Sequence, residues 1–362
     1  MKVLLVGEFS NVHNTLQQGL QELGVTVDTL NSGDGYRNYH SDIQPLKIKN
    51  NFVRKCYNKI LVNYLDQKYD VIQFMQELEW GRIEGLDSKA ALPLVKNARL
   101  SVLLLAGCNW EYARFAKEKV GISPCEECLE YDLKKKYACS HLYNKGNRKI
   151  EYAMQKNVDI MVPMTYEYDI CSKYGPFADK VADPICLPMK VRDNPVPKPK
   201  STERLVVYHP LNREGFKGTT MIRAAFAILQ ERYKDVAEFI IDGKMPFEEY
   251  SKLIERVDIM VDQKDGVTFG MASLQAMANG KILITGNYRN RISDPKYQYV
   301  KDAPAFELGT TTAEMVNNIS AVIERKFEFD NLKKRGAAYV NTYHDYRKVA
   351  QQFIDLYERH LR

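Results

Sequence analysis

Features that would place a protein in a membrane or outside the cell are missing from this sequence of 362 residues. No apolar run approaches the ~20 residues that span a bilayer, and residues 102–106 make only a strand. A buried strand, rather than a signal peptide, is predicted directly after Met1. The seven cysteines are odd in number and scattered, which favours reduced thiols over a disulfide framework. We therefore expect a cytoplasmic protein.

Motifs of two common nucleotide-dependent enzyme classes are also missing. The sequence has no Gly-x-Gly-x-x-Gly segment and no Walker loop, which argues against a dehydrogenase and a kinase. The net charge of +6 and the pI near 8.7 are only mildly basic. Such a balance suits an anionic ligand or an acidic membrane surface, and we expect no nucleic-acid partner.

The length and the apolar content of 45% predict two domains. Strands alternate with amphipathic helices in both halves, and strands such as 2–6 and 100–106 are continuously apolar. Continuous apolar strands indicate parallel sheets covered by helices on both faces, so the predicted fold class is α/β with two Rossmann-like, doubly wound domains. The predicted parts are a domain at 1–190, a Pro-rich linker at 191–202, a domain at 203–342 and a C-terminal helix at 343–362.

The segment 257–286 carries the clearest functional pattern. It reads as a strand, a turn of small residues, a helix and a second strand. The turn, Phe269-Gly270-Met271-Ala272, leaves backbone N–H groups free at the start of the helix. Such a helix end suits a phosphate or diphosphate.

A second pattern follows the strand near residue 205. The loop after it contains Asn212, Arg213 and Lys217 and leads into a helix. Two fixed cations there could neutralise the charge that develops on a departing nucleoside diphosphate, and no metal ion or other cofactor would then be required. The alternative is that both residues are solvated loop charges.

Together these segments resemble the donor signature of GT-B glycosyltransferases, especially family 4. The resemblance is specific over residues 205–286 and architectural elsewhere. It implies two domains facing each other across a cleft, with the final helix crossing back to the first domain. It also implies transfer of a sugar from a nucleoside diphosphate sugar to a hydroxyl of a saccharide or lipid-linked acceptor, with retention of configuration and without a metal ion. The lack of any Asp-x-Asp argues against the GT-A fold.

The sequence departs from the family signature at two positions. The family has two glutamates with seven residues between them, and Val267 and Gln275 stand at those positions here. An amide at Gln275 can still hydrogen-bond a ribose, but a valine side chain cannot bind a sugar hydroxyl. Sugar recognition would then fall to another group, for which Asp262, Asp265 and Thr268 are candidates. The resemblance further implies that Gly243 and Lys244 neighbour the nucleobase.

The first strand-to-helix loop offers polar groups to a sugar or an acceptor. Gly7 permits close backbone approach, and the side chains of Ser10 and Asn14 can hydrogen-bond a ligand. His13, at the opening of the first helix, is a candidate catalytic contact to the transferring sugar or the acceptor hydroxyl. The alternative for His13 is a local structural pairing.

An aromatic residue follows the most apolar strand of the first half. Trp110 comes soon after residues 100–106, at a strand end that points to the ligand crevice of a doubly wound sheet. It could stack on a sugar ring, with Glu111 as a polar contact or a base. Trp110 could equally be a core aromatic.

One cluster has partial zinc-site spacing. Cys125 and Cys128 form a Cys-x-x-Cys pair, and Cys139 and His141 follow. These four residues could close a structural site, although two ligands separated by one residue are tightly spaced. Unligated thiols are the alternative reading.

Basic residues recur in the first half, among apolar residues such as Phe52, Ile60 and Tyr64. The first cluster could lie on an anionic bilayer, which would make the protein peripheral on the inner face of the plasma membrane. A solvated charged face is the alternative. The cluster comprises Lys47, Lys49, Arg54, Lys55 and Lys59.

The sequence therefore predicts a glycosyltransferase of surface polysaccharide or glycoconjugate synthesis, by analogy with the family. Two other functions stay open. One is a catalytically impaired, glycosyltransferase-like partner or binding subunit, which the missing glutamates favour. The other is a different GT-B chemistry, such as nucleotide-sugar epimerisation.

Overall fold

The structure is a computed structural model, and its described residues fall into two compact units that are treated separately. The first unit takes its described residues from Met1–Val120, Cys139–Pro188 and Tyr346–Arg362, and the second from Gly121–Ala138 and Met189–Asp345. The predicted linker lies, beyond residue 191, outside the described residues. The described residues are 1–66, 68–76, 83–107, 109–130, 145–191, 204–286 and 289–361.

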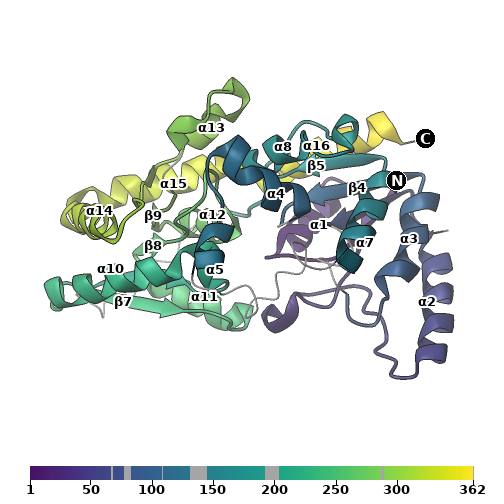
Figure 1. The fold of residues 1–362 in the computed structure, drawn as a ribbon, viewed down its shortest axis with the longest axis horizontal. Helices are drawn as coiled ribbons and strands as arrows, with labels where there is room; N and C mark the ends of the chain where they lie inside the picture. The colour runs from purple at the N-terminus through teal and green to yellow at the C-terminus, as the bar shows by residue number, and fades with distance from the viewer. Residues whose placement is uncertain are drawn as a thin grey trace. The chain divides into compact units, whose positions relative to one another are not determined.

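The first unit is built on a sheet of five parallel strands in the order β2-β1-β3-β4-β5 (Figure 1). In the register of the central pairs, Val3 lies opposite Val27 on one side and Val71 on the other. The strands β3 and β4 are buried along their whole length, as their apolar sequences predict. The strands are β1 (Lys2–Val6), β2 (Thr26–Leu30), β3 (Val71–Met75), β4 (Leu100–Leu105) and β5 (Ile160–Pro163).

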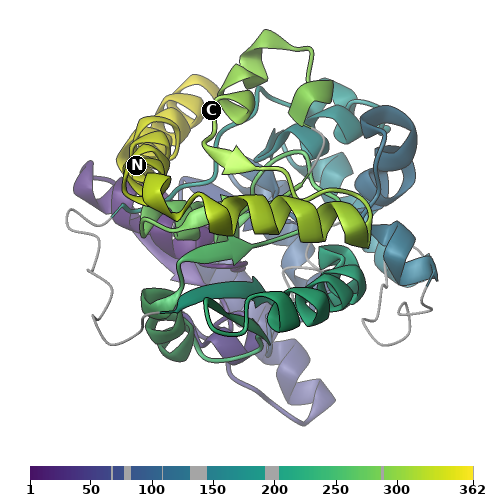
Figure 2. The same cartoon turned by 90° about the vertical axis from the view of Figure 1, so that its left-hand side faces the viewer.

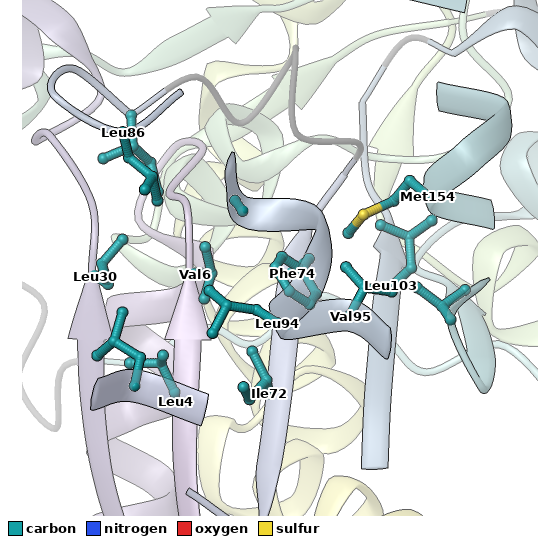
Figure 3. Packing of buried hydrophobic residues seen from close by; sticks show 14 of the residues in the cluster. Leu4, Val6, Leu30, Ile72, Phe74, Leu86, Leu94, Val95, Leu103 and Met154 are labelled. Atoms are coloured by element: carbon teal, nitrogen blue, oxygen red, sulfur yellow. The ribbon is translucent and has the colours of Figure 1, made fainter. Parts of the chain in front are cut away.

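The core of the first unit lies between this sheet and the helices that cover it. Figure 3 shows Ile72, Phe74 and Leu103 of the sheet packed beside Leu94 of α3 and Met154 of α7. All five side chains are almost completely buried. The helices are α1 (Val12–Glu22), α2 (Asn51–Asp66), α3 (Ser88–Asn97), α4 (Trp110–Phe115), α7 (Lys145–Asn157), α8 (Tyr166–Ser172) and α16 (Tyr346–His360), with short helical turns at Gly35–Arg37, Ala116–Val120 and Ala178–Lys180.

The C-terminal helix α16 belongs to the first unit because it packs against α1. A Cβ on Gly19 would come within 2.5 Å of the carbonyl oxygen of Tyr346, so only glycine allows this approach. The hydroxyl of Tyr346 donates a hydrogen bond of 2.7 Å to the carboxylate of Glu22. Farther along α16, the hydroxyl of Tyr357 donates to the amide oxygen of Gln73 on β3.

The second unit is also built on five parallel strands, in the order β10-β9-β8-β6-β7. The register sets Val207 of β6 opposite Phe239 of β7 and Ile259 of β8. The strands β6, β8 and β9 are completely buried. The strands are β6 (Leu205–Pro210), β7 (Ala237–Asp242), β8 (Ile259–Val261), β9 (Ile282–Ile284) and β10 (Ala305–Phe306).

Helices α10 and α14 bury apolar side chains against this sheet and lie side by side in Figure 2. On α10 these side chains include Ile222 and Leu229, and on α14 they include Ile319. Their core is formed in the same way as that of the first unit. The helices are α5 (Cys125–Glu130), α9 (Glu214–Lys217), α10 (Thr219–Arg232), α11 (Phe247–Arg256), α12 (Met271–Ala278), α13 (Gln298–Lys301), α14 (Thr312–Glu324) and α15 (Phe329–Tyr343), with short helical turns at Arg289–Arg291, Pro295–Tyr297 and Lys326–Glu328.

A short piece of the first half of the sequence packs with the second unit. Gly215 of α9 has no room for a Cβ, which would lie 2.3 Å from the sulfur of Cys128 on α5. A side-chain nitrogen of Arg291 donates a hydrogen bond to the carbonyl of Gly121. The predicted first domain at 1–190 includes α5, which in the structure packs with the second unit. The sequence gives no sign of this packing, because the partners of α5 lie about 90 residues later.

The predicted α/β fold with two doubly wound parallel sheets is confirmed by the two strand orders. The helix predicted within residues 257–286 is α12, and the C-terminal helix predicted at 343–362 is α16. In the part of the chain that the structure describes, no helix is both long and apolar enough to cross a bilayer.

The close approach at Gly19 gives a test of the packing of α16 on α1. In an exposed helix, Gly→Ala would stabilise the protein by about 1 kcal/mol. We expect Gly19→Ala instead to lower the free energy of unfolding by about 1–3 kcal/mol, because the new methyl group overlaps the backbone of Tyr346. Urea titration measures this difference, and a neutral or stabilising result would contradict the packing.

Candidate functional site

Three segments of the second unit meet at a buried ion pair. Lys217, the last residue of α9, forms an ion pair with Asp262, which directly follows β8. Asp262 also accepts a hydrogen bond from the hydroxyl of Ser273 in the first turn of α12. Asp262 is fully buried and Lys217 is nearly so. Because β6 and β8 are parallel neighbours, the loops at their carboxyl ends share one edge of the sheet, and the ion pair links both loops to α12.

The start of α12 is open. Gly270 is its N-cap, with extended backbone angles (φ −83°, ψ 175°), no capping side chain and no acidic residue in the first turn. A Cβ on Gly270 would have no atom within 4 Å, so there is free space beside it. The first N–H groups of a helix have no partner within the helix, and the partial positive charge there favours an anion. The amides of Met271 and Ala272 are therefore available to a ligand.

The start of α10 differs, because a carboxylate already occupies it. Glu127 of α5 accepts a hydrogen bond of 3.1 Å from the backbone N–H of Thr220. Burial raises the pKa of Glu127, an effect that the hydrogen bonds from Thr220 and the nearby charge of Lys264 oppose. Glu127 and Cys128 belong to the Cys-x-x-Cys pair, so a docking contact explains part of that motif.

Arg213 stands at the N-cap of α9, one helical turn before Lys217. Its guanidinium lies 3.9 Å from the ring centroid of Phe216 and its side chain is exposed. A guanidinium stacked on a ring is held in a defined orientation by a cation–π contact. Asn212, half-buried, precedes it in the same loop.

The other predicted donor-site residues belong to the same unit. Gln275 is half-buried on α12, four residues after Met271, and Phe269 is buried against the ring of Tyr339. Gly243 follows β7, where a Cβ would lie 2.1 Å from the carbonyl oxygen of Leu211, so only glycine fits. Lys244 is exposed beside it. These placements leave Gln275, Gly243 and Lys244 as candidates for ribose and base contacts.

The positions considered for sugar recognition are less accessible. Val267 is 2% exposed, so its side chain belongs to the core. Asp262 already binds Lys217 and Ser273, and Asp265 forms an ion pair of 2.6 Å with Lys264. Both carboxylates therefore have partners within the unit.

His209 is a residue of this region that the sequence patterns missed. Its Nδ1 donates to the carbonyl of Val261 at 2.8 Å, and the hydroxyl of Thr219 donates to its Nε2 at 2.8 Å. Burial lowers the pKa of His209 to about 4, so the ring is neutral near pH 7. It ties β6 to β8 and to the start of α10, and a lone strand histidine gives no sequence signal for such a role.

In the first unit, His13 is completely buried and both of its ring nitrogens are occupied. Its Nδ1 donates to the carbonyl of Gly7 at 2.7 Å, and the side-chain amide of Gln73 donates to its Nε2 at 3.2 Å. Burial lowers the pKa of His13 to about 4. This placement matches the local structural pairing, and a ligand could reach the ring only after a partner leaves.

Glu8, which sequence reasoning did not single out, fills the start of α1. One carboxylate oxygen accepts from the backbone N–H of Asn14 at 2.9 Å, and the other is buried without a partner among the described residues. Burial raises the pKa of Glu8 to about 8. Nearby, Ser10 has a positive φ of 54° and its N–H donates to Asp34. Glu8 thus occupies the helix end that a phosphate would otherwise take.

Trp110 is the first residue of α4, and its ring lies near two arginines rather than in open space. The guanidiniums of Arg148 and Arg114 lie 4.1 Å and 4.9 Å from the indole centroid. Glu111 is buried and accepts a hydrogen bond from the amide of Gln155. The predicted stacking of Trp110 on a sugar therefore competes with existing cation–π contacts.

Of the four residues considered for zinc, Cys139 and His141 lie outside the described residues. Cys125 and Cys128 both lie on α5, where Cys125 is half-buried and Cys128 is buried against α9. Among the residues that the structure describes, no three His, Cys, Asp or Glu side chains form a group able to hold a metal ion.

The structure thus gathers the predicted residues into two groups. The first unit contains Gly7, Ser10, His13, Asn14 and Trp110. The second contains the donor-site set, within which the ion pair joins Lys217 directly to the first turn of α12. That set comprises Asn212, Arg213, Lys217, Gly243, Lys244, Phe269, Gly270, Met271, Ala272 and Gln275.

The raised pKa of Glu8 predicts a pH dependence of stability. The unfolded chain releases this proton near pH 4.5 and the folded chain holds it to about pH 8, so stability falls as pH rises between these values, by at most about 1.4 kcal/mol per pH unit. We expect Glu8→Gln to remove this part of the slope and to stabilise the protein more at pH 8.5 than at pH 5. Urea titrations across pH measure it; the exposed Glu358→Gln is the control, and equal slopes for wild type and Glu8→Gln would refute the assignment.

Comparison with known proteins gives a fold but no family. No family model and no curated protein matches the sequence. Among solved structures, the chain is similar to a sucrose-phosphate synthase from Thermosynechococcus elongatus (TM-score 0.60, 15% identity, 99% of this chain and 98% of the other covered). It is also similar to a glycosyltransferase from Rickettsia africae (TM-score 0.59, 13% identity, 100% and 98% covered).

A third likeness is to a UDP-GlcNAc 2-epimerase from Neisseria meningitidis bound to UDP-GlcNAc (TM-score 0.53, 12% identity, 99% and 100% covered). At such low identity these likenesses establish the fold and leave the activity to be argued from the site. The chain has the GT-B fold, as the resemblance in its sequence predicted.

Proposed function

We propose that the protein is a glycosyltransferase that binds the diphosphate of a nucleoside diphosphate sugar at the open start of α12. The observation that carries this proposal is the link from Lys217 through Asp262 to Ser273, which holds a cation beside the uncapped amides of Met271 and Ala272. The solved structures of the same fold include enzymes described as glycosyltransferases, which supports this class of reaction.

The ion pair suits a site that stabilises a leaving diphosphate. Lys217 is fixed by Asp262 before any ligand arrives, so little reorganisation is needed when charge develops on the phosphate. Arg213 is exposed one turn away and can add a bidentate contact. The charge of Lys217 is shared with Asp262, so Arg213 and the amides of the helix start would supply most of the positive potential for a diphosphate, and we propose that transfer proceeds without a metal ion.

The rest of the donor would extend along the same unit. Gln275 lies one turn into α12 and is proposed to hold the ribose, while Gly243 and Lys244 are proposed to neighbour the base. Retention of anomeric configuration and membership of family 4 are proposed on the sequence resemblance alone. The same resemblance supports a role in surface polysaccharide or glycoconjugate synthesis, and one structural neighbour is described as acting in lipopolysaccharide biosynthesis.

One observation favours a second candidate, a binding subunit without transfer activity. Val267 is buried at the position where the family has a sugar-binding glutamate. Nucleotide binding without donor hydrolysis or transfer would identify such a subunit. Conversion of the sugar to its C2 epimer, without an acceptor, would instead identify an epimerase of this fold.

Substitution of Gly270 tests the donor site without disturbing the fold. We expect Gly270→Asp to place a carboxylate at the N-cap, leaving the melting temperature unchanged or raised, because Asp is a favourable N-cap residue. The same carboxylate should repel the diphosphate and weaken nucleotide binding by roughly tenfold or more. Thermal-shift titrations with UDP, GDP and ADP measure both effects.

Gly270→Ala is the matched control, because it adds only a methyl group in open space and should retain binding. Arg213→Ala should also weaken nucleotide binding. Lys234→Ala removes an exposed charge just after the end of α10 and should leave nucleotide binding unchanged. A Gly270→Asp protein that folds and binds nucleotide as tightly as wild type would overturn the proposal.

We also propose that the outer face of α2 rests on an anionic membrane. Phe52, Cys56, Ile60 and Tyr64 recur every four residues along this helix and are all exposed, Phe52 and Ile60 by 76% and 70%. Residues with this spacing share one face of a helix, and the opposite face buries Val62 and Leu65. Exposed apolar groups flanked by lysines are typical of helices that lie at a bilayer surface.

Charge reversal beside this face tests membrane contact. We expect Lys55→Glu with Lys59→Glu to weaken binding to phosphatidylglycerol-rich vesicles by roughly 30-fold or more, because each basic residue contributes about 1 kcal/mol. Co-sedimentation measures the bound fraction. The double variant Lys89→Glu and Lys96→Glu carries the same charge change on α3, and an equal loss there would show that only net charge matters.

A further inference from the structure

The first unit contains a cavity of about 430 Å³ between α4, α7 and the turn at residues 174–176. It is distinct from the donor-site residues, which all belong to the second unit. Its volume falls within the range of small-molecule sites. Its lining combines aromatic, acidic and basic side chains, among them Trp110, Glu111, Arg148, Glu151, Tyr152 and Tyr174.

Two buried carboxyl groups line this cavity. Glu151 accepts a hydrogen bond of 2.7 Å from the backbone N–H of Trp110 through one oxygen. Its other oxygen is buried and has no partner among the described residues, although Glu151 is only 4% exposed. Burial, with the nearby charge of Glu111, raises the pKa of Glu151 to about 7. A buried polar atom without a partner is costly, so this atom indicates a hydrogen-bonding group that a ligand would bring.

Two arginines also line the cavity, beside Trp110. Arg114 and Arg148 both contact the indole ring, and neither forms an ion pair with an acidic side chain in the described part of the chain. Because the Trp110 ring orients both guanidiniums, their planar donor edges are available to an anionic group. An arginine held in this way binds a carboxylate or a phosphate in two-point fashion.

Tyrosines complete the lining. Tyr152 and Tyr174 are 50% and 52% exposed, which is high for residues that line a cavity. Tyr152 is supported by the ring of Phe177 at 5.0 Å, and Tyr174 by that of Phe115 at 5.9 Å. The ring of Tyr174 also has the ammonium of Lys119 at 4.3 Å from its centroid, whereas Tyr152 offers its remaining surface to the apolar face of a ligand.

We infer that this cavity binds one sugar ring that carries a carboxylate or a phosphate. The sugar hydroxyls would form hydrogen bonds with Glu151 and Gln155. The anionic group would bind Arg114 and Arg148, and the apolar face of the sugar ring would lie on Tyr152. This inference rests on the proposed function in one respect: in a glycosyltransferase, a sugar held by this unit is the acceptor.

Calorimetric titration of the full chain with glucuronic acid, glucose 6-phosphate and glucose tests the inference. We expect the two acidic sugars to bind about tenfold more tightly than glucose, because charge-assisted hydrogen bonds are roughly twice as strong as neutral ones. Arg148→Gln should remove most of this preference. Lys149→Gln deletes the same charge from the next, exposed residue of α7, which does not line the cavity, and should leave the preference intact. Tyr152→Ala should weaken the binding of all three sugars to the same extent.

The outcomes separate this inference from the proposed function. Binding of acidic sugars by the Gly270→Asp protein, with affinity equal to wild type, supports a separate site in the first unit. Nucleotide binding by a chain that binds none of the three sugars would overturn the inference and leave the proposed function standing. Equal losses in Arg148→Gln and Lys149→Gln would also overturn it, since they would reduce the effect to net charge.

Discussion

The buried ion pair between Lys217 and Asp262 is the interaction on which the proposed donor site of the second unit depends. Removing two charges from water costs several kcal/mol for each ion, and their attraction repays this only when the remaining lone pairs are also satisfied. Here the hydroxyl of Ser273 supplies that additional hydrogen bond. The pair therefore fixes the end of α9 against the end of β8 and the first turn of α12. It holds the ammonium of Lys217 beside the carboxylate that binds the first turn of α12, independently of any ligand.

The starts of α1, α10 and α12 differ in whether a carboxyl group already binds their backbone N–H groups. Helices α1 and α10 each begin at a carboxylate supplied by a residue outside the helix, Glu8 and Glu127, so their free amides are already used. Burial raises the pKa of both acids, which shows that neither is solvated like a surface group. At α12 the equivalent space beside Gly270 is empty. Of these three helix starts, that of α12 is the one with space for an anion.

Local patterns predicted much of the fold, because continuous apolar strands and helices ending near glycine are visible in the sequence. Helices α3 and α15 contain Pro93 and Gly336 in their interiors, and neither residue type favours a helix in the sequence. For the candidate site, the sequence indicated Lys217 and the start of α12, but not the link between them through Asp262. The contact of Glu127 with α10 could not be predicted from the sequence, since its partner Thr220 lies 93 residues away. The neighbouring Cys-x-x-Cys spacing suggested instead a zinc site or unligated thiols. The burial of His13 depends on Gln73, sixty residues on.

The burial of Val267 follows from the way the loop between β8 and α12 is held. The loop between β8 and α12 is held internally, because Lys264 pairs with Asp265, and the N–H of Gly286 donates to the carbonyl of Gln263. A Cβ on Gly286 would lie 2.2 Å from the carbonyl oxygen of Gly266, so the backbone is closely packed there. This packing turns Val267 into the core, where a glutamate would be a buried acid without a partner. Restoring the family residue alone would then cost stability without presenting a carboxylate to a ligand. Sugar selectivity, in a transferase with this loop, has to come from groups outside the loop.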